Sequence, residues 1–240
     1  MLKNNELKII SKRLKKIFEQ VYNKIKNRKL TSKTLDNEVL NILKNQKFKF
    51  PENELEIEFS EPIDEIYKAK AGRTPYDLLC FGKINGKKFE IFINNKYGDM
   101  YSRTRNDITT YNNLLRLYLG ISRQRLTSII TINEKLIYKR VCGEEIVSYA
   151  VFVVDNRNRG AKFFLLEEIK DYLYVNPRNT MLQIRYNPSL GDPINYYDFC
   201  LNLIDTIFNA LEKSLNGIKT ELIVLSGIRK EIIKIGYENE

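Results

Sequence analysis

Residues 76–96 read YDLLCFGKINGKKFEIFINNK, and this stretch decides the fold. It consists of two strand-like runs, 76–84 and 87–96, separated by Asn85-Gly86. Asn-Gly between such runs favours a two-residue type I′ turn, because both central residues of that turn need positive φ. The stretch therefore predicts a β-hairpin in which, counting outward from the turn, Asp77 lies opposite Asn94.

This register would bring an acid, an amide and a lysine to one face. Lys96 shares the face of Asn94 because side chains alternate along a strand. Oxygen ligands hold Mg²⁺, the bound metal lowers the pKa of water, and a nearby lysine can stabilise charge that develops on a phosphate. From these residues alone the alternative, a surface hairpin with an ion pair between Asp77 and Lys96, stays open.

The order Thr74-Pro75-Tyr76-Asp77, a spacer, then Ile93-Asn94-Asn95-Lys96 at the end of an apolar strand resembles the PD-(D/E)xK nuclease motif. That superfamily includes most type II restriction endonucleases. The resemblance covers roughly residues 60–120. It implies an α/β fold with a restriction-endonuclease-like core, a central mixed β-sheet flanked by helices. It also implies that Asp77 is the first metal-binding acid and that Lys96 assists the attacking water.

One departure from the motif concerns Asn94, which stands where an Asp or Glu is expected. An amide oxygen can bind Mg²⁺ but carries no charge, so the resemblance implies that another carboxylate replaces the missing one. Our candidate is Asp107, predicted in the first turn of a helix over 106–119, where it could instead complement the helix dipole. The expected metal ligands are thus Asp77, Asn94 and Asp107. Glu90 is too far along the strand, about 13 Å from Asn94, and Asp99 is expected to belong to the turn at Gly98. The resemblance also implies a further carboxylate from an upstream segment, for which Glu61 and Glu65 are the nearest options.

Polar and basic residues flank the hairpin closely. Phosphates and base edges are contacted by such groups, so we expect DNA contacts from Arg73, Arg103, Arg105 and Asn106. A solvated loop is the alternative. A second polar cluster, a weaker candidate for base reading, consists of Arg178, Asn179, Gln183 and Arg185.

The net charge of +10 lies at one end of the chain. Residues 1–50 hold 14 of the 40 lysines and arginines but only four of the 30 acids. Apolar residues at steps of three and four predict an amphipathic helix over 6–27 within this segment. A concentrated basic surface favours a polyanion partner, although a solvated helix face would look the same.

Composition narrows the chemistry. The chain has no histidine, which excludes histidine bases and the common zinc sites. Its three cysteines, Cys80, Cys142 and Cys200, are far apart, so we expect neither a disulfide framework nor a zinc cluster. No apolar run long enough to span a membrane and no signal peptide is evident. We expect a cytoplasmic protein.

The remaining pattern predicts one nuclease domain over 1–240, with a basic helical segment (1–50), the catalytic hairpin and following helix (55–120), and further sheet and helices (121–240). Further expected elements are a second helix around 34–43, a short helix over 62–70, strands near 55–59, 135–142, 146–154, 162–166 and 181–186, and a helix from Pro193 to Leu215. The buried side of that last helix is expected to hold Leu201, Ile204, Ile207, Phe208, Leu211 and Leu215.

The resemblance predicts a Mg²⁺-dependent type II restriction endonuclease that cleaves double-stranded DNA at a specific short sequence. Its expected partners are a second copy of the chain in a homodimer and a cognate DNA methyltransferase. Two alternatives stay open: a repair or junction-resolving nuclease, and a non-catalytic DNA-binding protein with a decayed nuclease fold. Cleavage of DNA at one specific short sequence would distinguish a restriction enzyme from a repair or junction-resolving nuclease. Any cleavage of DNA would exclude a non-catalytic DNA-binding protein.

Overall fold

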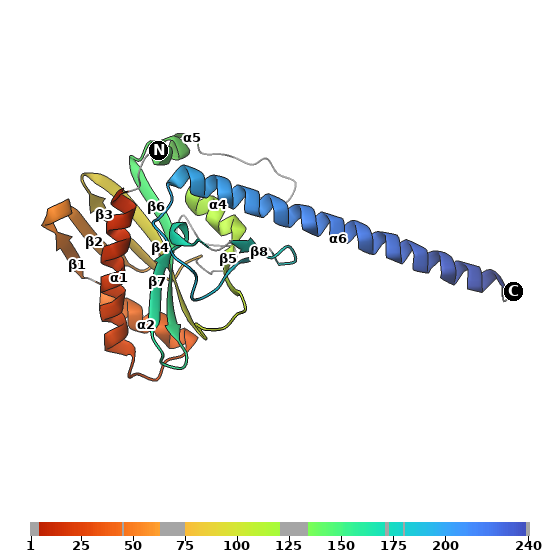
Figure 1. Cartoon of the computed structure of the whole chain (residues 1–240), viewed down its shortest axis with the longest axis horizontal. Helices are drawn as coiled ribbons and strands as arrows, with labels where there is room; N and C mark the ends of the chain where they lie inside the picture. Colours follow the sequence, from red (N-terminus) through yellow and green to blue (C-terminus); the bar gives the residue numbers. More distant parts are fainter. Residues whose placement is uncertain are drawn as a thin grey trace.

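The computed structural model describes residues 5–44, 46–62, 75–120, 134–170, 173–179 and 181–238 (Figure 1). Its helices are α1 (Asn5–Ile25), α2 (Ser32–Leu43), α4 (Tyr111–Leu119), α5 (Glu134–Val141) and α6 (Tyr196–Glu238). Its strands are β1 (Lys47–Phe50), β2 (Leu55–Ser60), β3 (Leu78–Ile84), β4 (Lys87–Gly98), β5 (Asn106–Thr110), β6 (Glu145–Asp155), β7 (Ala161–Leu165), β8 (Tyr174–Val175) and β9 (Met181–Ile184). Two 3₁₀ turns are η1 (Pro51–Asn53) and η2 (Leu166–Glu168).

The main sheet has six strands in the order β1-β2-β3-β4-β6-β7. All neighbours are antiparallel except β4 and β6, which run parallel. A smaller sheet has the order β5-β9-β8. The expectation of a mixed α/β architecture is therefore confirmed.

The hairpin forms as predicted. Asn85 and Gly86 have φ of 48° and 77°, as a type I′ turn requires. The pairing runs from Ile84–Lys87 to Leu78–Ile93, which is the predicted register. The ladder ends one residue short of Asp77, while β4 continues beyond Ile93 to Gly98.

The extension of β4 is held by β6 on its other side, from Lys88–Glu145 to Gly98–Asp155. Parallel neighbours need a long crossover connection, and here it contains β5, α4 and α5. Because parallel strands end at the same edge of a sheet, the segments that follow β4 and β6 emerge side by side. This edge carries the residues of the hairpin motif.

Two apolar layers cover the sheet, as the alternation of buried side chains requires. One face of the hairpin, with Leu78 and Ile91, packs against α1 and α2. The other face, with Leu79 and Phe92, packs against α4, the start of α6 and the small sheet. β4 is buried on both faces, which explains why its sequence is nearly continuously apolar.

The predicted strand over 135–142 is wrong, because this segment forms helix α5. A short apolar run does not distinguish the two by periodicity. Its helical form places basic residues in the last turn, and the buried Arg140 donates through Nη1 to the backbone oxygens of Leu117 and Tyr118 at 2.6 and 2.7 Å. Arg140 thereby satisfies carbonyls that the end of α4 leaves free.

Three further predictions need correction. The helix predicted from Asn106 begins at Tyr111, after strand β5 and with Thr110 as its N-cap. Strand β1 was not predicted. The last helix continues to Glu238. Among its side chains whose burial the structure describes, the buried ones are Phe199, Cys200, Leu203, Ile207 and Ala210, so the predicted buried side is wrong except at Ile207. The short helix predicted over 62–70 falls almost wholly outside the described residues.

In the described parts of the chain, no helix has both the length and the apolar content of a bilayer span.

Candidate active site

Asp77 lies at the entrance to β3, directly beyond the end of the hairpin ladder. Its backbone N–H donates to the oxygen of Ile93 at 2.8 Å, and its Oδ2 accepts the backbone N–H of Asn95 at 2.7 Å. The preceding Tyr76 is fully buried against Phe92, with ring centroids 4.9 Å apart. These contacts hold the carboxylate against β4.

The electrostatic state of Asp77 reflects its surroundings. Burial raises the pKa of Asp77 to about 6, and the nearby Asp36 carboxylate adds to the rise, while the Asn95 N–H and the Lys96 charge oppose it. Burial also lowers the pKa of Lys96, against the opposing charges of Asp77, Asp36 and Asp107. An acid and a lysine whose pKa values shift toward each other in this way are typical of functional sites.

Asp36 is a site residue that the sequence reasoning missed. It lies on α2, beside the buried Leu35, and α2 packs over β4. Burial raises the pKa of Asp36, with the Asn95 amide and the Lys96 charge partly offsetting the effect. The available signal was its position: an acid bordering the buried stripe formed by Leu35 and Val39 faces the sheet and not solvent.

Asn94 is buried, and hydrogen bonds from its amide nitrogen fix the position of its side chain. Nδ2 donates to Tyr149 Oη at 3.1 Å and to the oxygen of Ile108 at 3.4 Å, and Tyr149 Oη donates to the oxygen of Pro75 at 2.7 Å. The side chain therefore joins β4 to β5, β6 and the segment before Asp77. An acid at this position would bring negative charge against the Ile108 carbonyl, which gives a structural reason for an amide here.

Several of these residues carry buried polar atoms without a hydrogen-bond partner. Within the described chain, five buried side-chain nitrogen or oxygen atoms lack a hydrogen-bond partner, and four of them belong to Asp36 (Oδ1), Asn94 (Oδ1) and Asn95 (Oδ1 and Nδ2). Buried polar atoms normally have a partner, which can be water or an ion. Carboxylate and amide oxygens fit a hard divalent cation. No group of three or more acids or cysteines converges among the described residues, so such a cation would need other oxygens as well.

Asp107 lies on β5 and not in a helix turn, so its predicted position is wrong. It is exposed, and its Oδ1 accepts Gln183 Nε2 at 2.6 Å across the small sheet. Its charge acts on Lys96, but less strongly than the charges of Asp77 and Asp36. Asp107 therefore stays a candidate beside Asp36.

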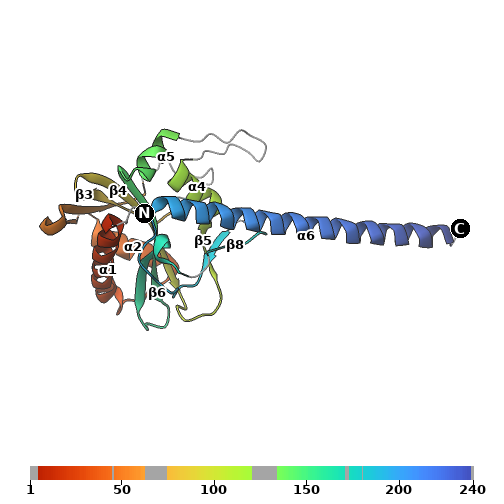
Figure 2. The same cartoon turned by 45° about the horizontal axis from the view of Figure 1, so that its top comes forward.

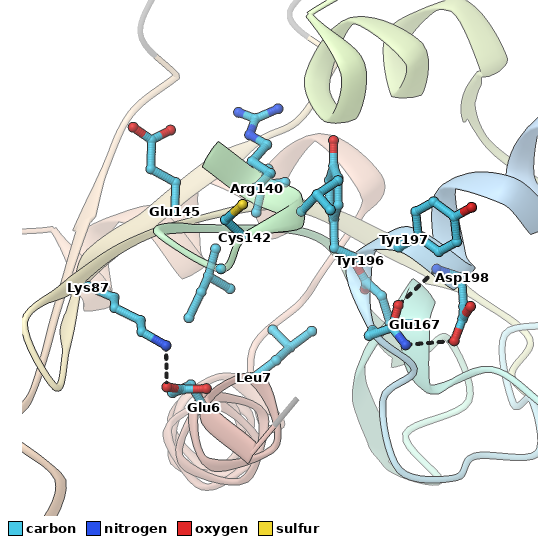
Figure 3. Close-up of a pocket in the computed structure, with 15 residues that line it drawn as sticks. Glu6, Leu7, Lys87, Arg140, Cys142, Glu145, Glu167, Tyr196, Tyr197 and Asp198 are labelled. Atoms are coloured by element: carbon cyan, nitrogen blue, oxygen red, sulfur yellow. Dashed lines mark hydrogen bonds and ion pairs between the residues drawn. The ribbon is translucent and has the colours of Figure 1, made fainter. Parts of the chain in front are cut away.

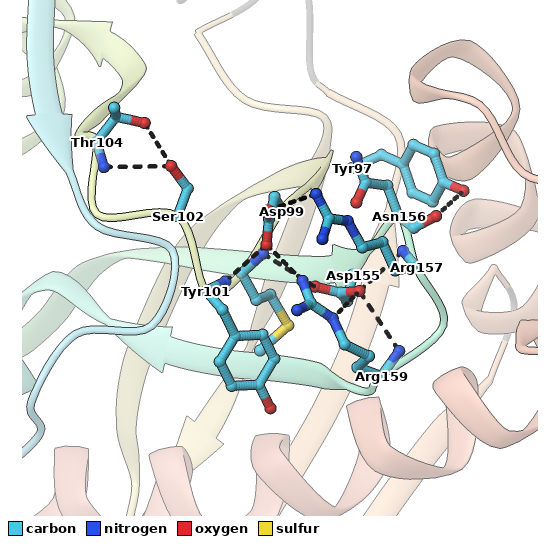
Figure 4. Close-up of polar contacts among 10 residues, drawn as sticks. Tyr97, Asp99, Tyr101, Ser102, Thr104, Asp155, Asn156, Arg157 and Arg159 are labelled. Carbon is cyan, nitrogen blue, oxygen red and sulfur yellow. Dashed lines mark hydrogen bonds and ion pairs between the residues drawn. The ribbon is translucent and has the colours of Figure 1, made fainter.

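The other acids near the hairpin have separate surroundings. Asp99 pairs with Arg157 at 3.3 Å and with Arg159, in the cluster around Asp155 that joins the turns after β4 and β6 (Figure 4). Glu61 is exposed and pairs with Lys44 at 2.6 Å. Glu90 lies opposite Phe81 in the β3–β4 ladder, nearer the turn than Asn94 by four residues. Glu65 lies outside the described residues.

Of the predicted DNA-contacting residues, Arg103 and Arg105 lie between β4 and β5, Asn106 begins β5, and Arg73 lies outside the described residues. Arg103 and Arg105 are exposed, and Arg105 lies over the Tyr174 ring, 4.9 Å from its centroid. Strand β5 pairs with β9, so Asn106 lies opposite Ile184 and Asp107 opposite Gln183. The structure thus joins the two polar clusters that the sequence separates, the second comprising Arg178, Asn179, Gln183 and Arg185.

The small sheet is fixed directly over the end of β4. A Cβ at Gly98 would lie 2.6 Å from the Tyr186 ring, so only glycine permits this approach. By contrast, several basic residues of α1 form ion pairs within the chain, with Glu52, Glu168 and Asp192 as acceptors. The small sheet meets the end of β4 at this point, and the charge of its Asp107 acts on Lys96.

A separate cavity of about 400 Å³ lies away from this site (Figure 3). It is lined by residues of α1, α5 and the start of α6, among them Leu7, Cys142 and Tyr197, and an ion pair of 2.8 Å joins Lys87 to Glu6 beside it. Asp77, Asn94 and Lys96 do not line it. The candidate active site therefore lies at the edge of the sheet and is separate from this cavity.

Comparison with known proteins identifies the family. No protein-family model matches the chain. The chain is 63% identical over 235 residues to the type II restriction enzyme MjaIV of Methanocaldococcus jannaschii, which covers 98% of this chain and 95% of the relative. Identity at this level over nearly the whole of both chains shows that the chain belongs to the type II restriction endonucleases.

Proposed function

We propose that this restriction endonuclease cleaves double-stranded DNA with Mg²⁺ at a PD-(D/E)xK site in which Asp77, Asp36 and Asn94 supply metal ligands and Lys96 acts on the scissile phosphate. One observation carries the proposal: the charge of Asp36 acts on the ionisation of Asp77, and both acids act on Lys96, beside residues with unpartnered buried oxygens. In this proposal residues 1–240 act as one nuclease domain with a restriction-endonuclease-like core.

Each residue has a distinct part in the reaction. The Mg²⁺ ion, when bound, polarises the phosphodiester and makes its water more acidic. Lys96, held between acids, orients the attacking water and stabilises the negative charge that develops on the phosphate. Asp77 is fixed by the Asn95 N–H, so it offers its second oxygen without rearrangement. Tyr149 holds Asn94 so that Oδ1, and not Nδ2, remains available.

The small sheet supplies the surface for reading the sequence. Arginine and glutamine side chains can pair with base edges in the major groove, and Arg103, Arg105, Gln183 and Arg185 lie on or beside strands that meet over the end of β4. The position of these residues next to Lys96 couples recognition to cleavage. Asn106, at the start of β5, joins this surface in the proposal, and Arg73 stays a DNA contact proposed from the sequence alone.

Two partners follow from the proposed chemistry. A duplex has two strands and each chain one such site, so a homodimer cleaves both strands symmetrically. An enzyme that cuts a short sequence also requires protection of the same sequence in its own genome, for which we propose a cognate DNA methyltransferase. Its place of action would be the cytoplasm, where that DNA lies.

A plasmid digestion tests the site. With Mg²⁺ the wild type should give discrete fragments, and Asp77→Asn or Lys96→Ala should lower cleavage by at least ~100-fold while retaining DNA binding. The matched controls Asp192→Asn and Lys47→Ala change exposed ion-paired residues away from the sheet edge and should cleave normally. Full activity in either site variant, or no cleavage by the wild type with any divalent metal, would refute the proposal.

A further inference from the structure

An exposed apolar stripe runs along α6. Its side chains are 42–61% exposed, and they are Tyr197, Leu201, Ile204, Phe208, Leu211 and Leu215. Successive members are separated alternately by four and three residues, so they lie on one side of the helix. Among the described side chains ten large apolar ones are exposed, and six of them belong to this stripe, which we name the α6 seam.

The protein's own core does not use this seam. The start of α6 packs on the sheet through a different face, with Phe199, Leu203, Ile207 and Ala210 buried. Beyond this contact the helix leaves the body of the protein and runs on alone to Glu238 (Figures 1 and 2). Isolated helices gain most of their stability from packing an apolar face, so a projecting helix with a bare stripe needs a partner.

The spacing of the seam identifies the kind of partner. The same alternation continues in the sequence at Ile218, Leu222 and Leu225. From Tyr197 to Leu225 it spans four heptads, roughly 42 Å of helix at 1.5 Å per residue. Apolar residues sustained at this 3.5-residue repeat are the pattern by which helices pair as coiled coils.

Charge argues against DNA as the occupant. Over Tyr196–Glu238 the helix carries six acids and five basic residues, whereas a helix that follows a phosphate backbone needs a positive excess. A second copy of the chain, by contrast, presents an identical seam, as a twofold interface requires. The cleavage of two strands, which rests on the proposed function, also calls for two copies.

We infer that the α6 seam is the dimer interface, with α6 of one chain pairing against α6 of a second copy. The exposed Tyr197 begins the seam beside the cavity of Figure 3, so the interface starts at the body and continues along the projecting helix.

The test is the mass of the full chain in solution, measured by size exclusion with light scattering. The wild type should have twice the chain mass of 28.3 kDa. Phe208→Lys with Leu211→Lys should weaken dimerisation by roughly 100-fold or more and give the monomer mass. The matched control, Asn202→Lys with Asn209→Lys, adds the same charge at exposed positions off the seam and should stay dimeric. At concentrations where the wild type is dimeric, far-UV circular dichroism should show equal helix content for the wild type and the control. In the seam variant any loss should be limited to the projecting part of α6, which has lost its partner.

Two results would overturn the inference: a monomeric wild type at micromolar concentration, or a seam variant that remains dimeric. A seam variant that loses more helix content than α6 contributes has unfolded in its body. It would be replaced by Leu201→Ser with Leu211→Ser, for which the same masses are decisive. The Lys96→Ala protein separates this inference from the proposed function, because it should dimerise fully without cleaving. A dimeric wild type that cuts no DNA would refute the function alone, whereas a monomeric wild type that cuts both strands would refute the interface alone.

Discussion

At the scale of single residues, the site contains two partly buried carboxylates, Asp36 and Asp77, and a nearby lysine, Lys96. Burial and the nearby Asp36 carboxylate raise the pKa of Asp77, burial raises the pKa of Asp36, and the charge of Lys96 only partly compensates at each acid. Paired acids of this kind are destabilising in the folded protein and useful for binding a cation. The site thus resembles other functional sites in which stability is lost for the sake of chemistry.

We expect Asp36→Asn to lower Mg²⁺-dependent cleavage by at least ~100-fold, as Asp77→Asn does, while raising the melting temperature of the metal-free protein. Removal of one buried negative charge relieves the other, which explains the gain in stability. The substitution Asp107→Asn changes an exposed residue, and it should lower the cleavage rate by less than ~10-fold. Cleavage assays and thermal melts measure both effects. A severe loss in Asp107→Asn with a mild loss in Asp36→Asn would transfer the role to Asp107.

At the scale of elements, one turn sets the geometry of the site. The type I′ turn fixes the register of β3 on β4, and this register places Asp77 at the end of the ladder beside Asn95. A slip of one residue would move every side chain of a strand to the opposite face. β6 then holds the extension of β4 that carries Lys96.

Gly86→Ala should lower the free energy of unfolding by about 1 kcal/mol, because an L-residue is strained at the φ of 77° found there. A Cβ at Gly86 meets nothing within 4 Å, so the loss arises from the backbone alone. Gly217→Ala is the control: its Cβ also meets nothing, but it lies within α6, where alanine is favoured. Urea unfolding should show a loss only in the turn variant, and equal stability of the two would contradict the role of the turn.

At the scale of the whole molecule, the layers are joined by a buried acid. Glu167 accepts hydrogen bonds from Tyr118 Oη on α4 and Ser148 Oγ on β6, each at 2.7 Å. Burial raises the pKa of Glu167 to about 7 from its ordinary 4.5, against the hydrogen bonds that lower it. The adjacent Glu168 accepts Ser11 Oγ and Lys15 Nζ of α1, so neighbouring acids connect helices on both faces of the sheet.

The raised pKa predicts a stability that falls with pH. Between about pH 4.5 and 7 the folded protein retains a proton on Glu167 that the unfolded chain releases. The free energy of unfolding therefore declines across this window by up to about 3 kcal/mol and this contribution is constant above it. Glu167→Gln, which resembles the protonated acid, should lack this decline. Urea unfolding of both proteins at several pH values tests it, and parallel profiles would exclude Glu167 as the cause.

The sequence by itself determined what depends on near neighbours. Asn85-Gly86 specifies its turn through local backbone preference, and the alternation around it gives the register and the position of Asp77. The amphipathic period likewise gave α1 and α2. The predictions of a strand over 135–142 and of a helix from Asn106 were wrong. Short apolar runs are compatible with either a helix or a strand until tertiary packing selects one.

The tertiary structure alone decided which distant groups meet. Asp36 lies 41 residues before Asp77, and only the packing of α2 over β4 makes it a neighbour of Lys96. The same holds for Gln183 beside Asp107. On α6 both apolar stripes satisfy helical periodicity, and the sequence does not say which one the sheet covers. Burial depends on the shape of the surface that each side chain meets, and that surface is assembled from segments far apart in the chain.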